Sequence, residues 1–154
     1  MSAEARFTEL NLQLPPAPKA VGVYKPIVEI DGLLYLSGHG PLRPDGTLIK
    51  GRLGDDLDVS AGYDAARQTG LAILATLKKH CGSLDRIDRL VKTFGLVQAT
   101  PEFTDQPAVI NGFSELMRDV FGEERGIAAR SAVGAASLPA GMAVEVEAIF
   151  ALVR

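Results

Sequence analysis

The last quarter of the chain constrains its fold most, because small and β-branched residues alternate there with polar ones. Residues 129–133 are Ala-Arg-Ser-Ala-Val and residues 144–149 are Val-Glu-Val-Glu-Ala-Ile, with Leu138, Pro139 and Gly141 between the two runs. An alternation with a period of two is typical of strands, and an intervening Pro and Gly indicate a turn. We therefore predict two neighbouring antiparallel strands, a hairpin, in this region.

Two charged residues stand out within the predicted hairpin. Arg130 and Glu145 fall near opposite ends of the two strands, which would bring them within reach of one small pocket. An arginine can hold a carboxylate through two parallel hydrogen bonds, and a glutamate in an apolar strand can position or deprotonate a water molecule. The pair therefore indicates a site for a small carboxylate-bearing molecule. Glu147 lies on the same strand face as Glu145 and is the main alternative to it.

Two segments have the periodicity of helices. The first begins near Ser60, which we predict as its N-cap, and ends at Gly82. In the second, apolar residues recur at spacings of three and four up to Gly122, where the helix is expected to end. The predicted buried face of this second helix comprises Val109, Phe113, Leu116, Met117 and Val120.

Strands and loops occupy the rest of the chain. Residues 27–37 contain two β-rich runs around an Asp-Gly pair, which is a strong hairpin signal, and we predict a long strand over residues 87–99. Residues 38–58 are rich in Gly and Pro and predict a long loop with a short strand near residues 47–50. The Pro-rich N-terminal segment, up to about residue 22, predicts an extended lead-in, with a short helix or strand before it.

The order of these elements predicts an α+β fold with two main helices packed on one face of a sheet. The 154 residues fit one domain, so we expect residues 1–154 to form a single unit. The chain offers no third long helix, and the second face of the sheet must therefore be covered by something else.

Composition narrows the possible partners and the compartment. The net charge of −3 and the absence of a dense basic run argue against a nucleic-acid partner. Cys81 is the one cysteine, which suits a reducing compartment, and with His80 beside it lacks the spacing of a metal site. No apolar stretch reaches the length of a membrane span, and the N-terminus lacks the features of a signal peptide. We therefore expect a soluble, cytoplasmic protein without a metal or a membrane partner.

Three motifs, in the right order along the chain, resemble the RidA (YjgF) family. The pattern Arg-Ser-x-Val-x4-Leu-Pro-x4-Val-Glu-Val-Glu-Ala-Ile of residues 130–149 resembles the C-terminal signature of that family. Gly22-Val23-Tyr24, followed by Ser37-Gly38-His39, resembles its Gly-Pro-Tyr and Ser-Gly-Gln elements, and Val109-Ile110-Asn111 resembles its Val-Asn element. The resemblance implies a chorismate-mutase-like mixed sheet and a homotrimer with sites in the clefts between subunits.

The resemblance also implies roles for individual residues. Arg130 would form the ion pair with the substrate carboxylate, and Glu145 would position the attacking water. Ala132 would contribute its backbone carbonyl, because it stands where many members carry a cysteine. The remaining substrate-binding residues that the resemblance implies are Tyr24, Ser37 and Asn111.

Each of these residues also has a plain structural explanation. Arg130 could form a salt bridge at the surface or between subunits, and Tyr24 could be a half-buried aromatic residue with its hydroxyl in water. Ser37 could simply end a strand, and Asn111 could cap the first turn of the second helix. His39 stands where the family commonly has Gln, and we expect it to be a loop histidine.

Several positions depart from the family pattern and indicate a divergent subgroup. Ala128 replaces the usual Pro, and Ser114 stands where an aromatic residue is usual. The lead-in and the loop of residues 43–58 also look longer than in the best-known deaminating members. These departures bear more on the identity of the substrate than on the fold.

The resemblance implies the hydrolytic deamination of a reactive enamine or imine, derived from an amino acid, to a 2-oxo acid and ammonia. Free imines hydrolyse readily, so a held carboxylate and a placed water suffice without a metal or an organic cofactor. The alternative is a non-catalytic module that binds or senses a small carboxylate such as a 2-oxo acid, which would need Arg130 but not Glu145. The acidic balance of the chain disfavours a third hypothesis, a ribonuclease.

Overall fold

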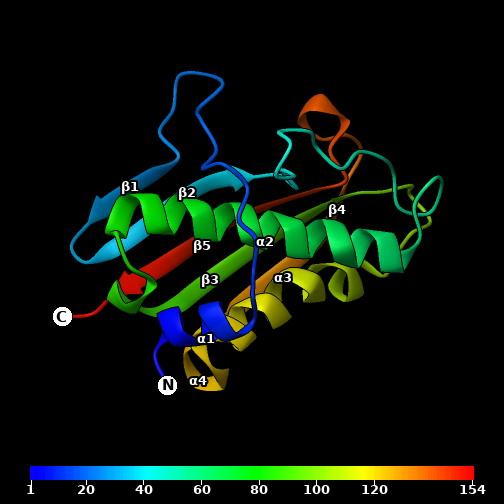
Figure 1. Cartoon of the computed structure of the whole chain (residues 1–154). Helices are drawn as coiled ribbons and strands as arrows, with labels where there is room; N and C mark the ends of the chain where they lie inside the picture. The colour runs from blue at the N-terminus through cyan, green and yellow to red at the C-terminus, as the bar shows by residue number, and fades with distance from the viewer.

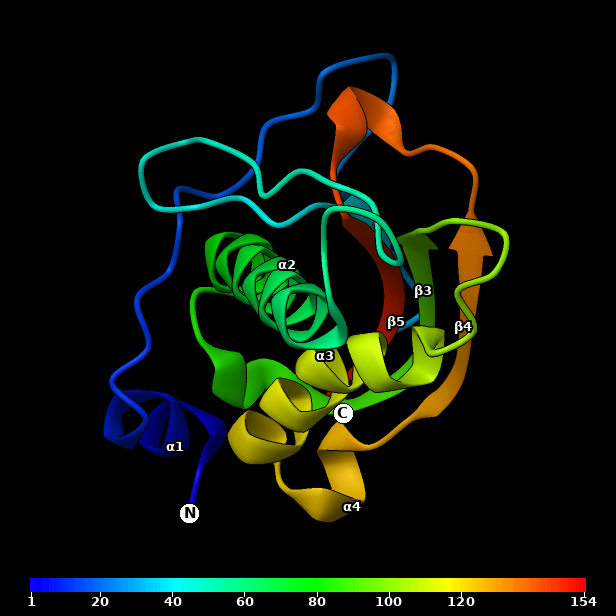
Figure 2. The same cartoon turned by 90° about the vertical axis from the view of Figure 1, so that its right-hand side faces the viewer.

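The computed structural model describes residues 1–154 and shows a five-stranded mixed sheet with the long helices on one face (Figures 1 and 2). The sheet has the strand order β1-β2-β5-β3-β4, in which only β3 and β4 are parallel neighbours. The strands are β1 (Ile27–Ile30), β2 (Leu33–His39), β3 (Ile87–Gln98), β4 (Ala129–Ala135) and β5 (Val144–Leu152). The predicted α+β arrangement is therefore present, with two main helices on one side of the sheet.

The predicted hairpin of the C-terminal region is wrong. β4 and β5 are both strands, but β3 lies between them and pairs with β4 in parallel and with β5 antiparallel. Alternation along a sequence reports which strand face is buried, and it does not identify the neighbouring strand. Helix α3 (Gln106–Phe121) connects β3 to β4 and provides the crossover that a parallel pair requires.

The N-terminal hairpin and the long strand agree with the sequence. β1 and β2 pair antiparallel around Asp31 and Gly32, whose φ values of 51° and 76° are those of a two-residue hairpin turn. β3 runs as predicted and ends before Pro101. The predicted short strand near residues 47–50 is absent, and only isolated bridges such as Leu42 to Leu48 occur there.

The first long helix, α2 (Val59–Cys81), begins earlier than predicted. Asp58 is its N-cap, because its side chain accepts a hydrogen bond from the Ala61 N–H at 2.8 Å, and Ser60 lies within the first turn. Both Ser and Asp are good N-caps, so composition alone could not choose between the two positions. Gly82 ends the helix with a φ of 79°, as predicted.

The second long helix, α3, ends at Gly122, and its predicted apolar face is buried. Gly112 lets α3 approach α2 closely, since a Cβ at this position would lie 2.0 Å from the Tyr63 carbonyl oxygen. The two helices and the covered face of the sheet enclose one cluster of 26 buried residues. No helix in the structure combines the length and the apolar character that a membrane crossing requires.

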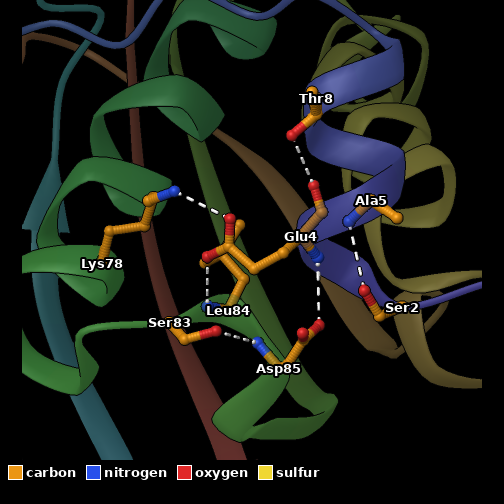
Figure 3. Close-up of polar contacts among 8 residues, drawn as sticks. All are labelled: Ser2, Glu4, Ala5, Thr8, Lys78, Ser83, Leu84 and Asp85. Atoms are coloured by element: carbon orange, nitrogen blue, oxygen red, sulfur yellow. Dashed lines mark hydrogen bonds and ion pairs between the residues drawn. The ribbon is translucent and has the colours of Figure 1, made fainter.

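The N-terminal lead-in begins with a short helix, α1 (Ala3–Glu9), which Glu4 ties to the rest of the molecule (Figure 3). One Glu4 carboxylate oxygen accepts from the Leu84 N–H at 2.7 Å, and the other pairs with Lys78 at 2.9 Å. Burial acts to raise the pKa of Glu4, but the Leu84 bond and Lys78 outweigh it and hold the pKa below its usual value. The remaining short helices are η1 (Leu84–Arg86), α4 (Glu123–Gly126) and η2 (Pro139–Gly141).

Three loops gather at one end of the sheet: the segment before β1, the long loop between β2 and α2, and the connection through η2 (Figures 1 and 2).

On the face of the sheet opposite the helices, which we call the open face, large apolar side chains are exposed. Val28, Ile30 and Tyr35 are all more than 40% exposed there.

Candidate functional site

Glu145 lies in a hollow of about 580 Å³ at the loop-covered end of the sheet; we call this the Glu145 hollow. It is lined by the lead-in with Tyr24, by the end of β2 with Ser37 and Gly38, and by the beginning of β5. Apolar side chains from the neighbouring loops, including Met142, complete its wall. Three of the residues predicted for the site, Tyr24, Ser37 and Glu145, are thus brought together by one protomer.

Glu145 points toward the open face of the sheet. It alternates with the buried residues Val144 and Val146, which face the helices. Gly38 makes room for its carboxylate, because a Cβ at Gly38 would lie 2.1 Å from Glu145 Oε1. The absence of a side chain at Gly38 is therefore a requirement of the site, which the sequence did not reveal.

Burial raises the pKa of the Glu145 carboxyl group, and the negative charge of Glu147 raises it further. Glu145 has no cationic partner in the structure. A raised pKa brings a carboxyl group closer to the range in which it can both accept and donate a proton. Glu147 lies on the same strand face, as predicted, but it lines a separate hollow with Tyr35 and Lys92.

Arg130 lies in another, smaller hollow of about 320 Å³, which we call the Arg130 hollow. Its Nη1 donates to Asn111 Oδ1 at 2.8 Å and to Ser114 Oγ at 3.2 Å, both on α3. Both acceptors are neutral, and no carboxylate lies within ion-pair distance of Arg130. The guanidinium group is therefore oriented by the protein but keeps an unpaired charge for an anion.

The structure does not bring Arg130 and Glu145 into one pocket of the protomer. Arg130 pairs across β3 with Thr93, which is 1% exposed and faces the helices, whereas Glu145 pairs with Leu96 on the open face. The prediction that the two side chains share a pocket within one chain is therefore wrong. It failed because β3 separates the strands and because their side chains point to opposite faces of the sheet.

The remaining predicted residues divide between the two hollows. Asn111 lies in the second turn of α3, not in its first, and acts as an acceptor for Arg130 rather than as a cap. Ala132 follows on the same strand as Arg130 and packs against the core. Tyr24 is half exposed, and its hydroxyl accepts from the Val21 N–H at 3.3 Å. The Ser37 hydroxyl donates to the Lys25 carbonyl and ties β2 to the lead-in.

His39 is not a loop histidine. It is the last residue of β2, it is 4% exposed, and its ring contacts Thr76 on α2 and the backbone of Ser37. Sequence reasoning also missed Ser114 as a partner of Arg130. The departure from the aromatic residue that the family usually has at this position was the available signal.

Comparison with known proteins supports the resemblance. The family model described as "YjgF/chorismate mutase-like, putative endoribonuclease" matches residues 4–147. The chain belongs to the YjgF/RidA family. Protein TCP17 of Trypanosoma cruzi is 40% identical over 148 residues, which cover 96% of this chain and 92% of that protein.

Two solved structures extend this assignment to the fold of the YjgF/RidA family. The structure of "a putative endoribonuclease" from Shewanella oneidensis MR-1 superposes with a TM-score of 0.93 at 31% identity, covering 99% of this chain and 100% of that one. A Rid family protein of unknown function from Yersinia pestis superposes with a TM-score of 0.64 at 29% identity, covering 88% and 93%. The mixed sheet with its helices on one face is thus shared with family members.

Proposed function

We propose that this protein hydrolyses reactive enamines and imines derived from amino acids to 2-oxo acids and ammonia. In this proposal it acts as a homotrimer, and Arg130 of one protomer faces the Glu145 hollow of its neighbour across the subunit boundary. The cleft between the two protomers then contains a cation for the substrate carboxylate and an acid for the water.

One observation supports this proposal above the others: each protomer carries an oriented arginine and a half-buried glutamate, and neither has a partner of opposite charge. The two groups point to opposite faces of the same sheet, so they cannot serve one ligand within the protomer. A charge left without a counterion at a partly buried site is costly. A ligand carboxylate at Arg130 would compensate the arginine, and association would bring it near Glu145 of the next protomer.

The open face of the sheet supports association of this kind. Val28, Ile30 and Tyr35 expose large apolar side chains on it, and no helix of the same chain covers them. Apolar surface of this sort marks an interface, and closed symmetric assemblies are the usual solution. Tyr24 belongs to the lead-in that borders the Glu145 hollow, where it would contact the substrate from the Glu145 side of the cleft.

The chemistry requires only anchoring and proton transfer. Arg130 binds the substrate carboxylate, and the ionised Glu145 accepts a proton from a water molecule as its oxygen attacks the imine carbon. The proton passes from Glu145 to the nitrogen, the carbon–nitrogen bond breaks, and ammonia leaves while the hydroxyl of the intermediate loses its proton to form the 2-oxo acid. An enamine first takes a proton on carbon and loses one from nitrogen to become the imine. One water is consumed, and no electrons are exchanged.

The test follows 2-oxo acid release from an imine generated in place. A pyridoxal-phosphate enzyme supplies 2-aminoacrylate, and pyruvate formation is measured with native protein, Arg130→Ala and Arg118→Ala. We expect Arg130→Ala to reduce the catalysed rate by about 100-fold or more, because a charge-assisted pair is lost. Arg118 lines the same hollow but is paired with Asp119 at 3.0 Å, so its replacement is the matched control.

Equal rates for native protein and Arg130→Ala would remove the proposal. Calorimetry with a 2-oxo acid separates catalysis from sensing, because sensing needs Arg130 but not Glu145. Tight binding that survives Glu145→Gln, together with no imine turnover by the native protein, would replace deamination with recognition of a carboxylate.

A further inference from the structure

The end of β2 contains a β-bulge next to Glu145. Leu36 pairs with Ala148 and His39 pairs with Val146, so two residues of β2, Ser37 and Gly38, lie opposite one residue of β5. The backbone of this bulge forms a wall of the Glu145 hollow, and Gly38 is the position that leaves space for the carboxylate. Bulges recur beside functional sites because they redirect side chains.

The extra residue changes which face His39 occupies. Leu34 and Leu36 point to the helices and are buried, so in a regular strand Gly38 would follow them and His39 would point to the open face. The bulge shifts the alternation by one residue and turns His39 inward, under α2. There the ring is 4% exposed and is held on both sides by hydrogen bonds.

The two hydrogen bonds define the protonation of the ring. Nδ1 lies 2.6 Å from the Ser37 carbonyl oxygen, which can only accept, so Nδ1 carries the proton. Nε2 lies 2.8 Å from the Thr76 hydroxyl on α2 and, in the neutral ring, accepts from it. Burial lowers the pKa of His39, against a smaller opposite effect of the Ser37 bond, and this favours the neutral form.

The polar partners of the ring come from two elements: α2 contributes the Thr76 hydroxyl, and the bulge contributes the Ser37 carbonyl. Glu145 of β5 points to the other face of the sheet, where its carboxylate lies over Gly38. Lys19 and Tyr24 of the lead-in line the same hollow. Both hydrogen bonds of His39 go to neutral partners, Ser37 and Thr76, and none joins it to a charged group.

We propose that His39 is a positioning residue: held by Thr76, it fixes the bulge at Ser37-Gly38 and thereby fixes the space in which the Glu145 carboxylate works. The role given to that carboxylate rests on the proposed deamination. The fixing of the bulge by His39 and Thr76, which we call the His39 clamp, does not. A glutamine side chain offers the same pattern, one N–H donor for the Ser37 carbonyl and one acceptor for the Thr76 hydroxyl. A leucine of similar size offers neither.

The first experiment compares His39→Gln with His39→Leu, and Thr76→Val with Thr69→Val. Thr69 is a matched control, because it is also buried on α2 but donates to the Ala65 carbonyl of its own helix. We expect kcat for imine hydrolysis to fall about tenfold in His39→Leu and about fivefold in Thr76→Val, with KM unchanged because Arg130 binds the carboxylate. We expect His39→Gln and Thr69→Val to stay within about twofold of native protein.

The second experiment does not depend on turnover. Nitrogen NMR of the native protein identifies the His39 tautomer, and carbon NMR follows the titration of the Glu145 carboxyl group in the same variants. We expect an Nδ1-protonated neutral ring at pH 7, and a Glu145 titration that changes in His39→Leu and Thr76→Val but not in His39→Gln.

An Nε2-protonated ring, or an unchanged Glu145 titration in Thr76→Val, would overturn the His39 clamp even where His39→Leu fails to fold. A loss of activity in His39→Gln equal to that in His39→Leu would also overturn it, because the ring would then act in proton transfer. If Arg130→Ala were fully active, the deamination proposal would fail, but the NMR experiment would still test the role of His39.

Discussion

The Glu145 hollow and the Arg130 hollow are built in opposite ways. The first is the larger, at about 580 Å³ against about 320 Å³, and three loops and a bulge enclose an acid whose pKa is raised. The second lies between the edge strand β4 and α3, and presents a guanidinium group that two neutral oxygens orient. In the first hollow, burial shifts the pKa of a carboxyl group; in the second, hydrogen bonds orient a charged guanidinium group.

In the proposed trimer, each hollow supplies half of one site. A glutamate can accept or donate a proton but does not attract a carboxylate, whereas an arginine attracts a carboxylate but offers no base. We therefore expect changes at the Glu145 hollow to affect the chemical step and changes at the Arg130 hollow to affect substrate binding. The following experiments test this division.

Mixing two inactive variants should have the largest effect. Arg130→Ala retains Glu145, and Glu145→Gln retains Arg130, so in the proposed trimer a mixed assembly contains one boundary at which both intact groups meet. After subunit exchange of equal amounts, we expect recovery from background to about a quarter of the native rate, as random mixing of a cyclic trimer gives. Mass measurement of the exchanged assemblies accompanies the pyruvate assay.

The control for this mixture replaces Glu145→Gln with the double variant Arg130→Ala, Glu145→Gln, in which no boundary regains an arginine. Recovery should then be absent. If the two single variants exchange subunits but remain inactive together, the two hollows do not cooperate between protomers, and the proposed division of roles between them fails.

Gly38→Ala should separate activity from stability. The new Cβ would lie 2.1 Å from Glu145 Oε1, which is the end of a flexible side chain and can move away. We expect kcat to fall at least about tenfold while the free energy of unfolding changes by less than about 1 kcal/mol. Gly22→Ala is the control, because its Cβ would make an ordinary contact of 3.5 Å with the Tyr24 ring. A native kcat in Gly38→Ala would show that the position of this carboxylate does not matter.

The parts of the fold that local patterns specify could be predicted from the sequence. The Asp31-Gly32 hairpin, the strand β3 and the ends of both long helices at Gly82 and Gly122 all depend on residues close to one another in the chain. The pairing of β4 with β3 depends instead on a helical crossover, and alternation in β4 is the same whichever strand it joins.

The candidate site shows the same limit. Tyr24, Ser37 and Glu145 do meet in one hollow, as the motifs indicate. The separation of Arg130 from Glu145 followed from strand order, which the motifs do not contain. The inward turn of His39 required one extra residue in β2, and a bulge leaves no sign in composition.

Asn111→Ala should raise KM and leave kcat almost unchanged. Its Oδ1 is the nearer of the two neutral acceptors of Arg130, at 2.8 Å, so its loss lets the guanidinium group move but does not remove the charge. We expect KM to rise about fivefold, the effect of one hydrogen bond. Ser114→Ala, with the longer contact of 3.2 Å, should have a smaller effect in the same direction. A fall in kcat with unchanged KM would place Asn111 in the chemical step and contradict the division.

Glu147→Gln should produce the smallest effect, a shift of the acid limb of the pH profile. The Glu147 charge helps to raise the pKa of Glu145, so its removal lowers that pKa and keeps the base ionised to a lower pH. We expect the fall of kcat on acidification to begin at a lower pH, by a fraction of a unit, and Glu123→Gln on α4 to leave it unchanged.

The stability of the protein should depend on the protonation of Glu145 in the opposite direction from catalysis. A carboxyl group whose pKa is raised by folding stabilises the protein when it is protonated, and this contribution is lost as pH rises from the usual glutamate value through the raised one. The melting temperature should therefore fall across that pH window in native protein, fall less in Glu147→Gln, and show no such fall in Glu145→Gln. If the melting temperature fell equally in all three proteins, folding would not raise the pKa of Glu145, and the contrast between the two hollows would lose its energetic basis.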